Sequence, residues 1–113
     1  MTNHENVSFF DTAPGVELGI LRQHDAAGMT FFVRMAKGSR APLHDQPGGE
    51  ETYMIRGRLR IGQRRDADGK PQDDAVVDAG GYFFAPPGEI HDGTAEEDCL
   101  FFVVAAGGVA AKN

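Results

Sequence analysis

Glycine and proline interrupt this chain so often that few stretches are long enough for a stable helix. The 113 residues include 6 prolines and 15 glycines, the latter roughly twice the average usage of about 7%. Glycine weakens helix interiors and proline breaks them. The best helix candidate, residues 94–106, contains the aromatic and β-branched run 100–104, which favours a strand. The sequence therefore predicts an all-β fold.

Eight segments have the composition expected of strands. Their residue ranges are 7–10, 16–23, 29–36, 51–56, 58–63, 75–77, 82–85 and 99–104. A turn is expected over residues 95–98. Because side chains alternate along a strand, Thr52 and Met54 should share one face with Glu50. In the same way, Phe31, Val33 and Met35 should share a face. Short strands at intervals of about ten residues are typical of a β-sandwich or a small barrel.

Length, composition and charge limit the possible classes of function. The chain fits one domain over residues 1–113, with a core over about residues 16–104 and loose termini, the first six residues and 107–113. Its longest apolar run is far shorter than the ~20 residues of a membrane span. A net charge of −6 disfavours binding to nucleic acid. The N-terminus lacks a secretory signal, and the single cysteine, Cys99, is compatible with a reducing compartment. We therefore expect a cytoplasmic protein with a small-molecule substrate.

Four polar side chains form the pattern that points most directly to chemistry: His44, Gln46, Glu50 and His91. Imidazole nitrogens and carboxylate oxygens are common ligands of zinc, iron and manganese. His44 and Gln46 are two residues apart, so they point the same way in an extended segment. The sequence Pro-Gly-Gly then turns the chain before Glu50. Two neighbouring antiparallel strands would bring His91 to the same point. The alternative is that each histidine is an ordinary hydrogen-bonded residue.

The spacing around the first three of these residues resembles the first motif of the cupin family. That motif consists of glycine, five residues, His-x-His, three or four residues, glutamate, six residues and glycine. The chain matches it from Gly38 through His44 and Glu50 to Gly57, except that Gln46 replaces the second histidine.

A second stretch resembles the second cupin motif, which consists of glycine, five residues, proline, one residue, glycine, two residues and histidine. Here these positions are Gly80, Pro86, Gly88 and His91, while Ala95 replaces the asparagine that often ends the motif. The resemblance covers about residues 16–104. It implies a single-domain cupin, which is an antiparallel β-barrel or jelly roll with a metal site inside, and it implies a homodimer.

Carried over position by position, the resemblance implies His44, Gln46, Glu50 and His91 as metal ligands. The family usually has three histidines and one glutamate, so Gln46 leaves three outcomes open. Its amide oxygen coordinates the metal, its amide hydrogen-bonds a metal-bound water, or the metal is lost and a polar pocket remains. We favour a retained metal, because two buried imidazoles and a carboxylate without partners would cost several kcal/mol. The expected ion is Fe²⁺, followed by Zn²⁺, Mn²⁺ or Ni²⁺.

Within the cupins, residues 47–51 beside His44 resemble two smaller groups. One is the cupin portion of zinc-binding anti-sigma factors, and the other is a set of non-haem-iron dioxygenases that cleave diketones and hydroxylated aryl ketones. Two hypotheses follow. The first is a metal-dependent dioxygenase, or related oxidoreductase, acting on a small anionic or enolisable carbonyl compound, with an isomerase or a lyase as a variant. The second is a non-catalytic zinc-binding or ligand-sensing module. An open pocket that reaches the metal favours the enzyme, and a plugged barrel favours the sensor.

Some further residues have both a functional and an ordinary interpretation. Four are expected to line the pocket or its floor, with core packing as the alternative: Thr52, Met54, Phe83 and Phe84. A basic run is interpreted as a solvated strand face and loop rather than an anion site; it consists of Arg56, Arg58, Arg60, Arg64 and Arg65. Beyond chemistry on a metal-bound substrate, the sequence assigns no catalytic residue.

Overall fold

The structure is a computed structural model that describes residues 6–111. Over this range the chain forms eleven strands and no helix. The strands are β1 (Phe10–Ala13), β2 (Val16–Gln23), β3 (Met29–Met35), β4 (Arg40–Asp45), β5 (Glu50–Arg56), β6 (Arg58–Arg65), β7 (Ala75–Asp78), β8 (Tyr82–Ala85), β9 (Ile90–Ala95), β10 (Cys99–Ala105) and β11 (Ala110–Ala111). Among the described residues, no helix is long and apolar enough to cross a membrane.

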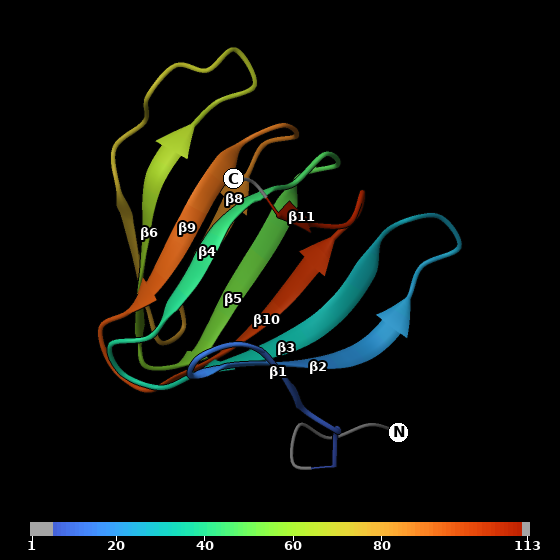
Figure 1. The fold of residues 1–113 in the computed structure, drawn as a ribbon, viewed down its shortest axis with the longest axis vertical. Coiled ribbons are helices and arrows are strands. Elements are labelled where there is room, and N and C mark those ends of the chain that lie inside the picture. The colour runs from blue at the N-terminus through green and yellow to red at the C-terminus, as the bar shows by residue number, and fades with distance from the viewer. Residues whose placement is uncertain (1–5, 112–113) are drawn as a thin grey trace.

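Two antiparallel sheets face each other across one core (Figure 1). One sheet has six strands in the order β1-β2-β3-β10-β5-β8, and the other has five in the order β11-β4-β9-β6-β7. Neighbours in a sheet are mostly distant in sequence, as in a jelly roll. The predicted all-β, antiparallel barrel-like fold is confirmed.

The core consists of the inward-facing side chains of both sheets. On β3, Phe31, Val33 and Met35 are buried, and on β5 the side chains of Thr52 and Met54 are buried on the same face as Glu50. Both alternations predicted from the sequence are therefore confirmed. The inward-facing row of β5 therefore consists of Glu50, Thr52 and Met54, with the acid at its start.

The strand predictions are accurate for most of the six-stranded sheet but fail at four strands, β1, β4, β9 and β11. The segment predicted at residues 7–10 forms a strand only from Phe10 onwards. Strands β4 and β9 were not predicted, and β9 reaches Ala95, where a turn was expected. The C-terminal segment expected to be loose contains β11, which pairs with β4. The expectation for residues 1–5 and 112–113 lies outside the described part of the chain.

Candidate metal centre

Three strands from the two sheets bring the predicted ligands together. β4 and β9 are neighbours in the five-stranded sheet, and their register places His44 directly opposite His91. Glu50 is the first residue of β5 in the facing six-stranded sheet, with its side chain turned inward. The two histidines therefore come from one sheet and the carboxylate from the other.

The ligand atoms of these three residues lie within 4.8 Å of one another. His44 Nε2 is 3.6 Å from Glu50 Oε2, and His91 Nε2 is 3.4 Å from Glu50 Oε1. Two ligands bound at about 2.1 Å in a tetrahedral site are separated by about 3.4 Å. The distances to Glu50 therefore fit one divalent cation held by two imidazoles and one carboxylate.

Pairing of the Glu50 carboxylate with the two imidazoles shifts the pKa values of this group. Burial alone would raise the pKa of Glu50, but hydrogen bonding and charge from His44 and His91 outweigh it and lower that pKa to about 2. For His44, burial lowers the pKa, but the neighbouring Glu50 carboxylate outweighs burial, and the pKa lies above its usual value. Glu50 is therefore a carboxylate over the physiological range, as a metal ligand must be.

The outer ring nitrogens of both histidines have their own acceptors. His44 Nδ1 lies 2.9 Å from the carbonyl oxygen of Pro42, and His91 Nδ1 lies 2.8 Å from Glu89 Oε2. A carbonyl or a carboxylate only accepts, so each Nδ1 donates its hydrogen. Both Nε2 atoms therefore face Glu50. When each ring is neutral and Nδ1 keeps its hydrogen, Nε2 is the nitrogen available to a metal.

Gln46 is fully buried beside this group. Its Nε2 donates to the carbonyl oxygen of His44 at 3.2 Å, while its Oε1 has no hydrogen-bond partner among the described residues. A buried oxygen without a partner costs about 1–3 kcal/mol, and a cation or a metal-bound water would satisfy it. Coordination by Gln46 stays a prediction.

The backbone of Gln46 connects the two loops that precede Glu50 and His91. Its N–H donates to the carbonyl oxygen of Glu89 at 3.3 Å, and its carbonyl oxygen accepts from the N–H of Gly88 at 2.9 Å. The same carbonyl accepts from the N–H of Gly49. Gln46 therefore fixes the relative positions of the two loops, whether or not its side chain binds a metal.

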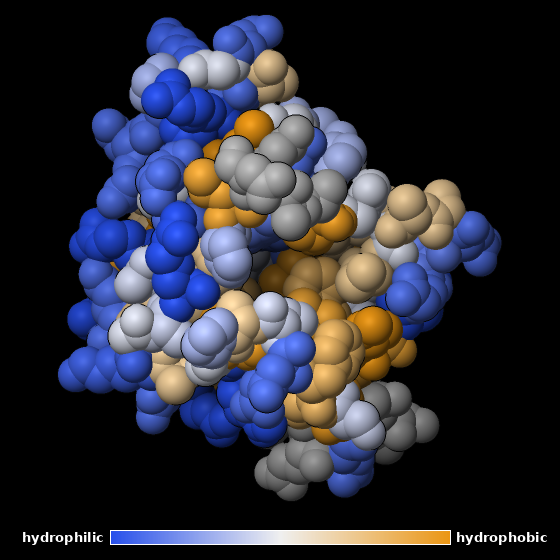
Figure 2. Space-filling view, in the orientation of Figure 1, coloured by the Kyte–Doolittle hydropathy of each residue, from blue (hydrophilic) through white to orange (hydrophobic). Residues whose placement is uncertain are grey.

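A cavity of about 440 Å³ opens between the sheets and reaches all three candidate ligands. Figure 2 shows a hollow with apolar side chains around it on this face of the molecule. The wall is mostly apolar and comes from both sheets; it includes Leu18, Ile20, Met29, Phe31, Val33, Leu59, Ile61, Phe101, Val103 and Val109. The polar side chains on it are those of Thr12, His44, Glu50, Thr52, His91 and Asp92.

The four residues predicted to line the pocket lie in different places. Thr52 is on the cavity wall. Met54 is buried in the core beyond it, and Phe84 is 50% exposed on the outside of β8. Phe83 packs edge-on against the His91 ring, with 6.0 Å between ring centroids. The strand alternation explains the difference, since Phe83 and Phe84 face opposite sides of the sheet.

Two buried acids near the candidate ligands were not identified from the sequence. Glu89 and Asp92 are buried acids on either side of His91. Asp92 accepts from Arg40 at 2.9 Å and from Gln63 at 2.7 Å, and Arg64 binds Glu89 through two hydrogen bonds. Glu89 could have been found, because it lies two residues before His91 in an extended segment and therefore on the same face.

Comparisons with known proteins agree with this fold. An RmlC-like cupin from Shewanella frigidimarina is 19% identical, with a TM-score of 0.72 over 91% of this chain and 86% of that one. KdgF from Halomonas sp. is 21% identical, with a TM-score of 0.71 over 99% and 92%. A chain of the Rhodobacter sphaeroides complex between SigE and the anti-sigma ChrR is 21% identical, with a TM-score of 0.72 over 91% of this chain and 51% of that one. At these identities the likeness establishes the fold alone.

No curated protein was found to match the chain. A family model does match, over residues 1–109, and it describes the ChrR cupin-like domain. The match spans nearly the whole chain and includes the three strands that carry the candidate ligands. The chain belongs to the ChrR cupin-like family.

Proposed function

We propose that this cupin is a metal-dependent, dioxygenase-like enzyme that uses dioxygen to oxidise or cleave a small, uncharged, enolisable carbonyl compound. The observation that carries the proposal is the open cavity of about 440 Å³ that reaches His44, Glu50 and His91. A purely structural metal site would need no such access. The expected metal is Fe²⁺, because two histidines and one carboxylate form the ligand set of many ferrous oxygenases.

The cavity wall supports an uncharged substrate. Among the described residues that line it, none is a lysine or an arginine. The one acid on the wall besides Glu50 is Asp92, which Arg40 and Gln63 already bind. A substrate carboxylate that does not itself bind the metal would therefore lose its hydration without meeting a cationic side chain. This argues against the anionic substrate that the sequence left open.

The charge of the centre supports an enolisable carbonyl group. A divalent cation bound there supplies Lewis acidity toward substrate oxygens and, if it is iron, a site for dioxygen. The Glu50 carboxylate offsets one of its two charges, so that the loaded centre keeps a positive charge that favours an enolate. The apolar wall holds the rest of the substrate and excludes water from the centre.

Oxygen uptake tests this proposal. Protein loaded anaerobically with Fe²⁺ should consume dioxygen with pentane-2,4-dione or 1-phenylbutane-1,3-dione and should ignore oxalate. Protein loaded with Zn²⁺ and the His91→Ala variant serve as controls and should show no uptake. If the Fe²⁺ protein consumes neither dioxygen nor any diketone, the proposal is wrong. Consumption of diketone without dioxygen would instead indicate an isomerase or a lyase.

A non-catalytic sensor remains the second candidate, because the matching family model describes the ChrR cupin-like domain. The same cavity would then hold a regulatory ligand. Binding of a diketone without its consumption, measured by calorimetry on the metal-loaded protein, would favour the sensor over the enzyme.

We also propose that the protein is a homodimer. Three aromatic side chains are exposed on the outer face of the six-stranded sheet: Tyr53, Tyr82 and Phe84. A second copy that covered them would remove apolar surface from water. Sedimentation equilibrium should give twice the chain mass for the wild type and the chain mass for Tyr82→Glu; a monomeric wild type would contradict this.

The proposed location is the cytoplasm, where Cys99 would stay reduced.

A further inference from the structure

Glu89 is a buried acid whose position the proposed chemistry does not explain. Its side chain is 2% exposed and is not part of the cavity wall, so it contacts no substrate. Its Oε2 accepts the Nδ1 hydrogen of His91 at 2.8 Å, while the Nε2 of the same ring faces Glu50. Glu89 therefore acts on the candidate metal centre only through His91.

Arg64 holds this carboxylate from the opposite side. Its Nε and Nη2 atoms donate to Glu89 Oε2 and Oε1 at 3.2 Å and 3.0 Å. A third hydrogen bond, from Nη1 to the carbonyl oxygen of Asp73 at 2.7 Å, anchors the guanidinium. The guanidinium also lies 5.0 Å from the centre of the Phe83 ring, which packs against His91. A two-point hydrogen-bonded pair of this kind fixes the plane and the direction of the carboxylate.

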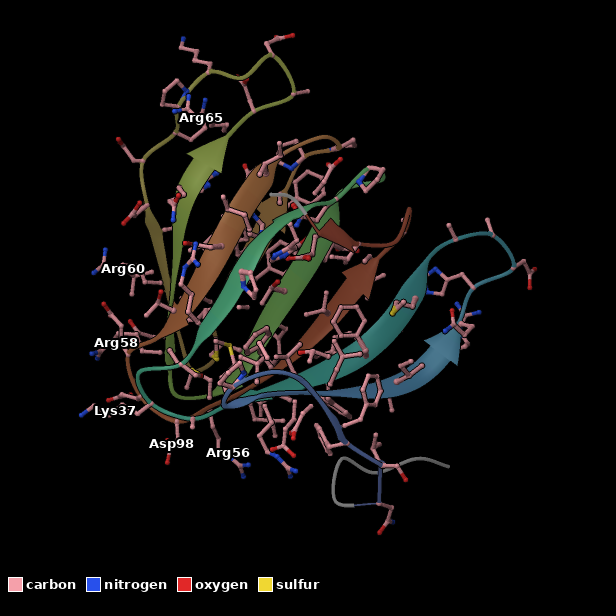
Figure 3. All side chains as sticks on the ribbon, viewed as in Figure 1. Lys37, Arg56, Arg58, Arg60, Arg65 and Asp98 are labelled. Atoms are coloured by element: carbon pink, nitrogen blue, oxygen red, sulfur yellow. The ribbon has the colours of Figure 1, made fainter. Side chains whose placement is uncertain are left out.

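A β-bulge directs Arg64 inward. The register of β6 against β9 shifts between Gly62 and Arg65, and Gln63 has a φ of +50°, the one positive value outside glycine among the described residues. A bulge reverses the alternation of side chains beyond it. Arg58 and Arg60 before the bulge and Arg65 beyond it lie on the outside of the sheet (Figure 3). Arg64 is turned inward, and its side chain is only 17% exposed. The predicted solvated strand face is wrong for Arg64 alone in this strand.

We propose that Arg64 and Glu89 form a positioning pair that sets the metal affinity of the centre through His91. The proposal rests on the metal site of the proposed function and not on the reaction with dioxygen. A carboxylate bound to Nδ1 fixes the orientation and tautomer of a histidine ligand and makes its Nε2 a stronger donor to a metal. Arg64 occupies both oxygens of Glu89, so the acid stays on Nδ1 instead of moving to the metal.

Zn²⁺ affinity, measured by competition with a chromophoric chelator, tests the pair without any need for enzymatic activity. Glu89→Gln should bind Zn²⁺ about 10- to 100-fold more weakly than the wild type, the usual effect of removing a partner of a ligating histidine. Arg64→Met should weaken binding as well. If Arg64 acts through Glu89, the double variant should bind no more weakly than Glu89→Gln, because the two effects are not additive. Glu89→Asp, which keeps the charge, should recover part of the affinity.

A matched control comes from the same strand. Arg60 and Glu96 form an exposed pair at 2.8 Å that touches no histidine, so Arg60→Met and Glu96→Gln should leave Zn²⁺ affinity unchanged. The visible spectrum of bound Co²⁺ separates positioning from folding, since its ligand-field bands should shift in Glu89→Gln and stay constant in Glu96→Gln. Wild-type affinity and spectrum in Glu89→Gln would overturn the inference. A wild type that binds no Zn²⁺ would instead contradict the metal site itself.

Discussion

At the scale of single residues, Glu50 is the central group of the site. It lies between the Nε2 atoms of His44 and His91 and is 6% exposed. Without metal, the favourable charge pairing with the imidazoles outweighs the cost of burying the carboxylate, which is why its pKa falls to about 2. The same pairing raises the pKa of His44. The two shifts have opposite signs and give the metal-free protein a defined pH range of added stability.

This range predicts how the stability of the metal-free protein depends on pH. The lowered pKa of Glu50 stabilises the fold above the ordinary glutamate pKa of 4.5, and this stabilisation is lost as the pH falls from 4.5 towards 2. The raised pKa of His44 stabilises the fold below the ordinary histidine pKa of 6.5, and this stabilisation is lost as the pH rises through the raised pKa. The contribution of the pair should therefore be greatest between pH 4.5 and 6.5. The contribution is the difference in the free energy of urea unfolding between the wild type and Glu50→Gln, measured at a series of pH values. A difference that does not change with pH would be inconsistent with the pairing.

At the scale of strands, local composition predicts the six-stranded sheet better than the sheet that carries the histidines. β4 contains Pro42 and Asp45, and β9 contains Asp92 and Gly93, all poor strand formers. Both strands lie between two neighbours in the sheet, so hydrogen bonds from distant segments determine them and the local sequence does not. The spacing of the two cupin motifs nevertheless identified His44 and His91, because that spacing reflects the site and not strand propensity.

The contrast between local sequence and pairing with distant segments also explains which residues around the candidate ligands were predictable. The place of Glu89 follows from its two-residue spacing to His91. Arg64 could not be placed, because the bulge that turns it inward arises where β6 pairs with β9. Alternation counted along β6 puts Arg64 on the same face as Arg60, which is exposed. A single shift of register in tertiary pairing thus changed its role.

The turn between β5 and β6 gives a prediction at this scale. Gly57 is its one connecting residue, with a φ of +87°, and an added Cβ would clash with the carbonyl oxygen of Asp98. Gly57→Ala should therefore lower the free energy of unfolding by more than about 2 kcal/mol, since it combines backbone strain with a clash against backbone.

Gly69→Ala is the control for backbone strain alone. Gly69 has a φ of +82°, but an added Cβ there would meet no atom within 4 Å. The expected loss is about 1–2 kcal/mol. Urea unfolding of both variants gives the comparison, and equal losses at the two positions would show that the contact with Asp98 does not matter.

At the scale of the whole molecule, the candidate centre connects the two sheets. His44 and His91 come from the five-stranded sheet, and Glu50 comes from the six-stranded sheet across the core. The cavity beside them leaves part of the space between the sheets without packed side chains. A metal bound by all three residues would therefore join the sheets beside the cavity, where side chains do not fill the space between them.

Metal binding should consequently stabilise the whole fold. A ligand present at 100 times its dissociation constant adds about 2.7 kcal/mol to the free energy of unfolding, which corresponds to a rise in Tm of about 10 °C or more for a chain of this size. Thermal unfolding with Zn²⁺ and with EDTA measures the shift. His91→Ala should show almost none of it, and an equal Tm of the wild type in both conditions would mean that no metal joins the sheets.

His44, Glu50 and His91 are expected to hold one cation, which elemental analysis of protein purified without chelators can measure. The wild type and a His24→Ala control, which removes a histidine bonded to Thr30 outside the centre, should each contain about one metal ion per chain. His44→Ala and Glu50→Ala, folded by circular dichroism, should contain far less. Full metal content in both of these variants would show that these residues do not hold the cation.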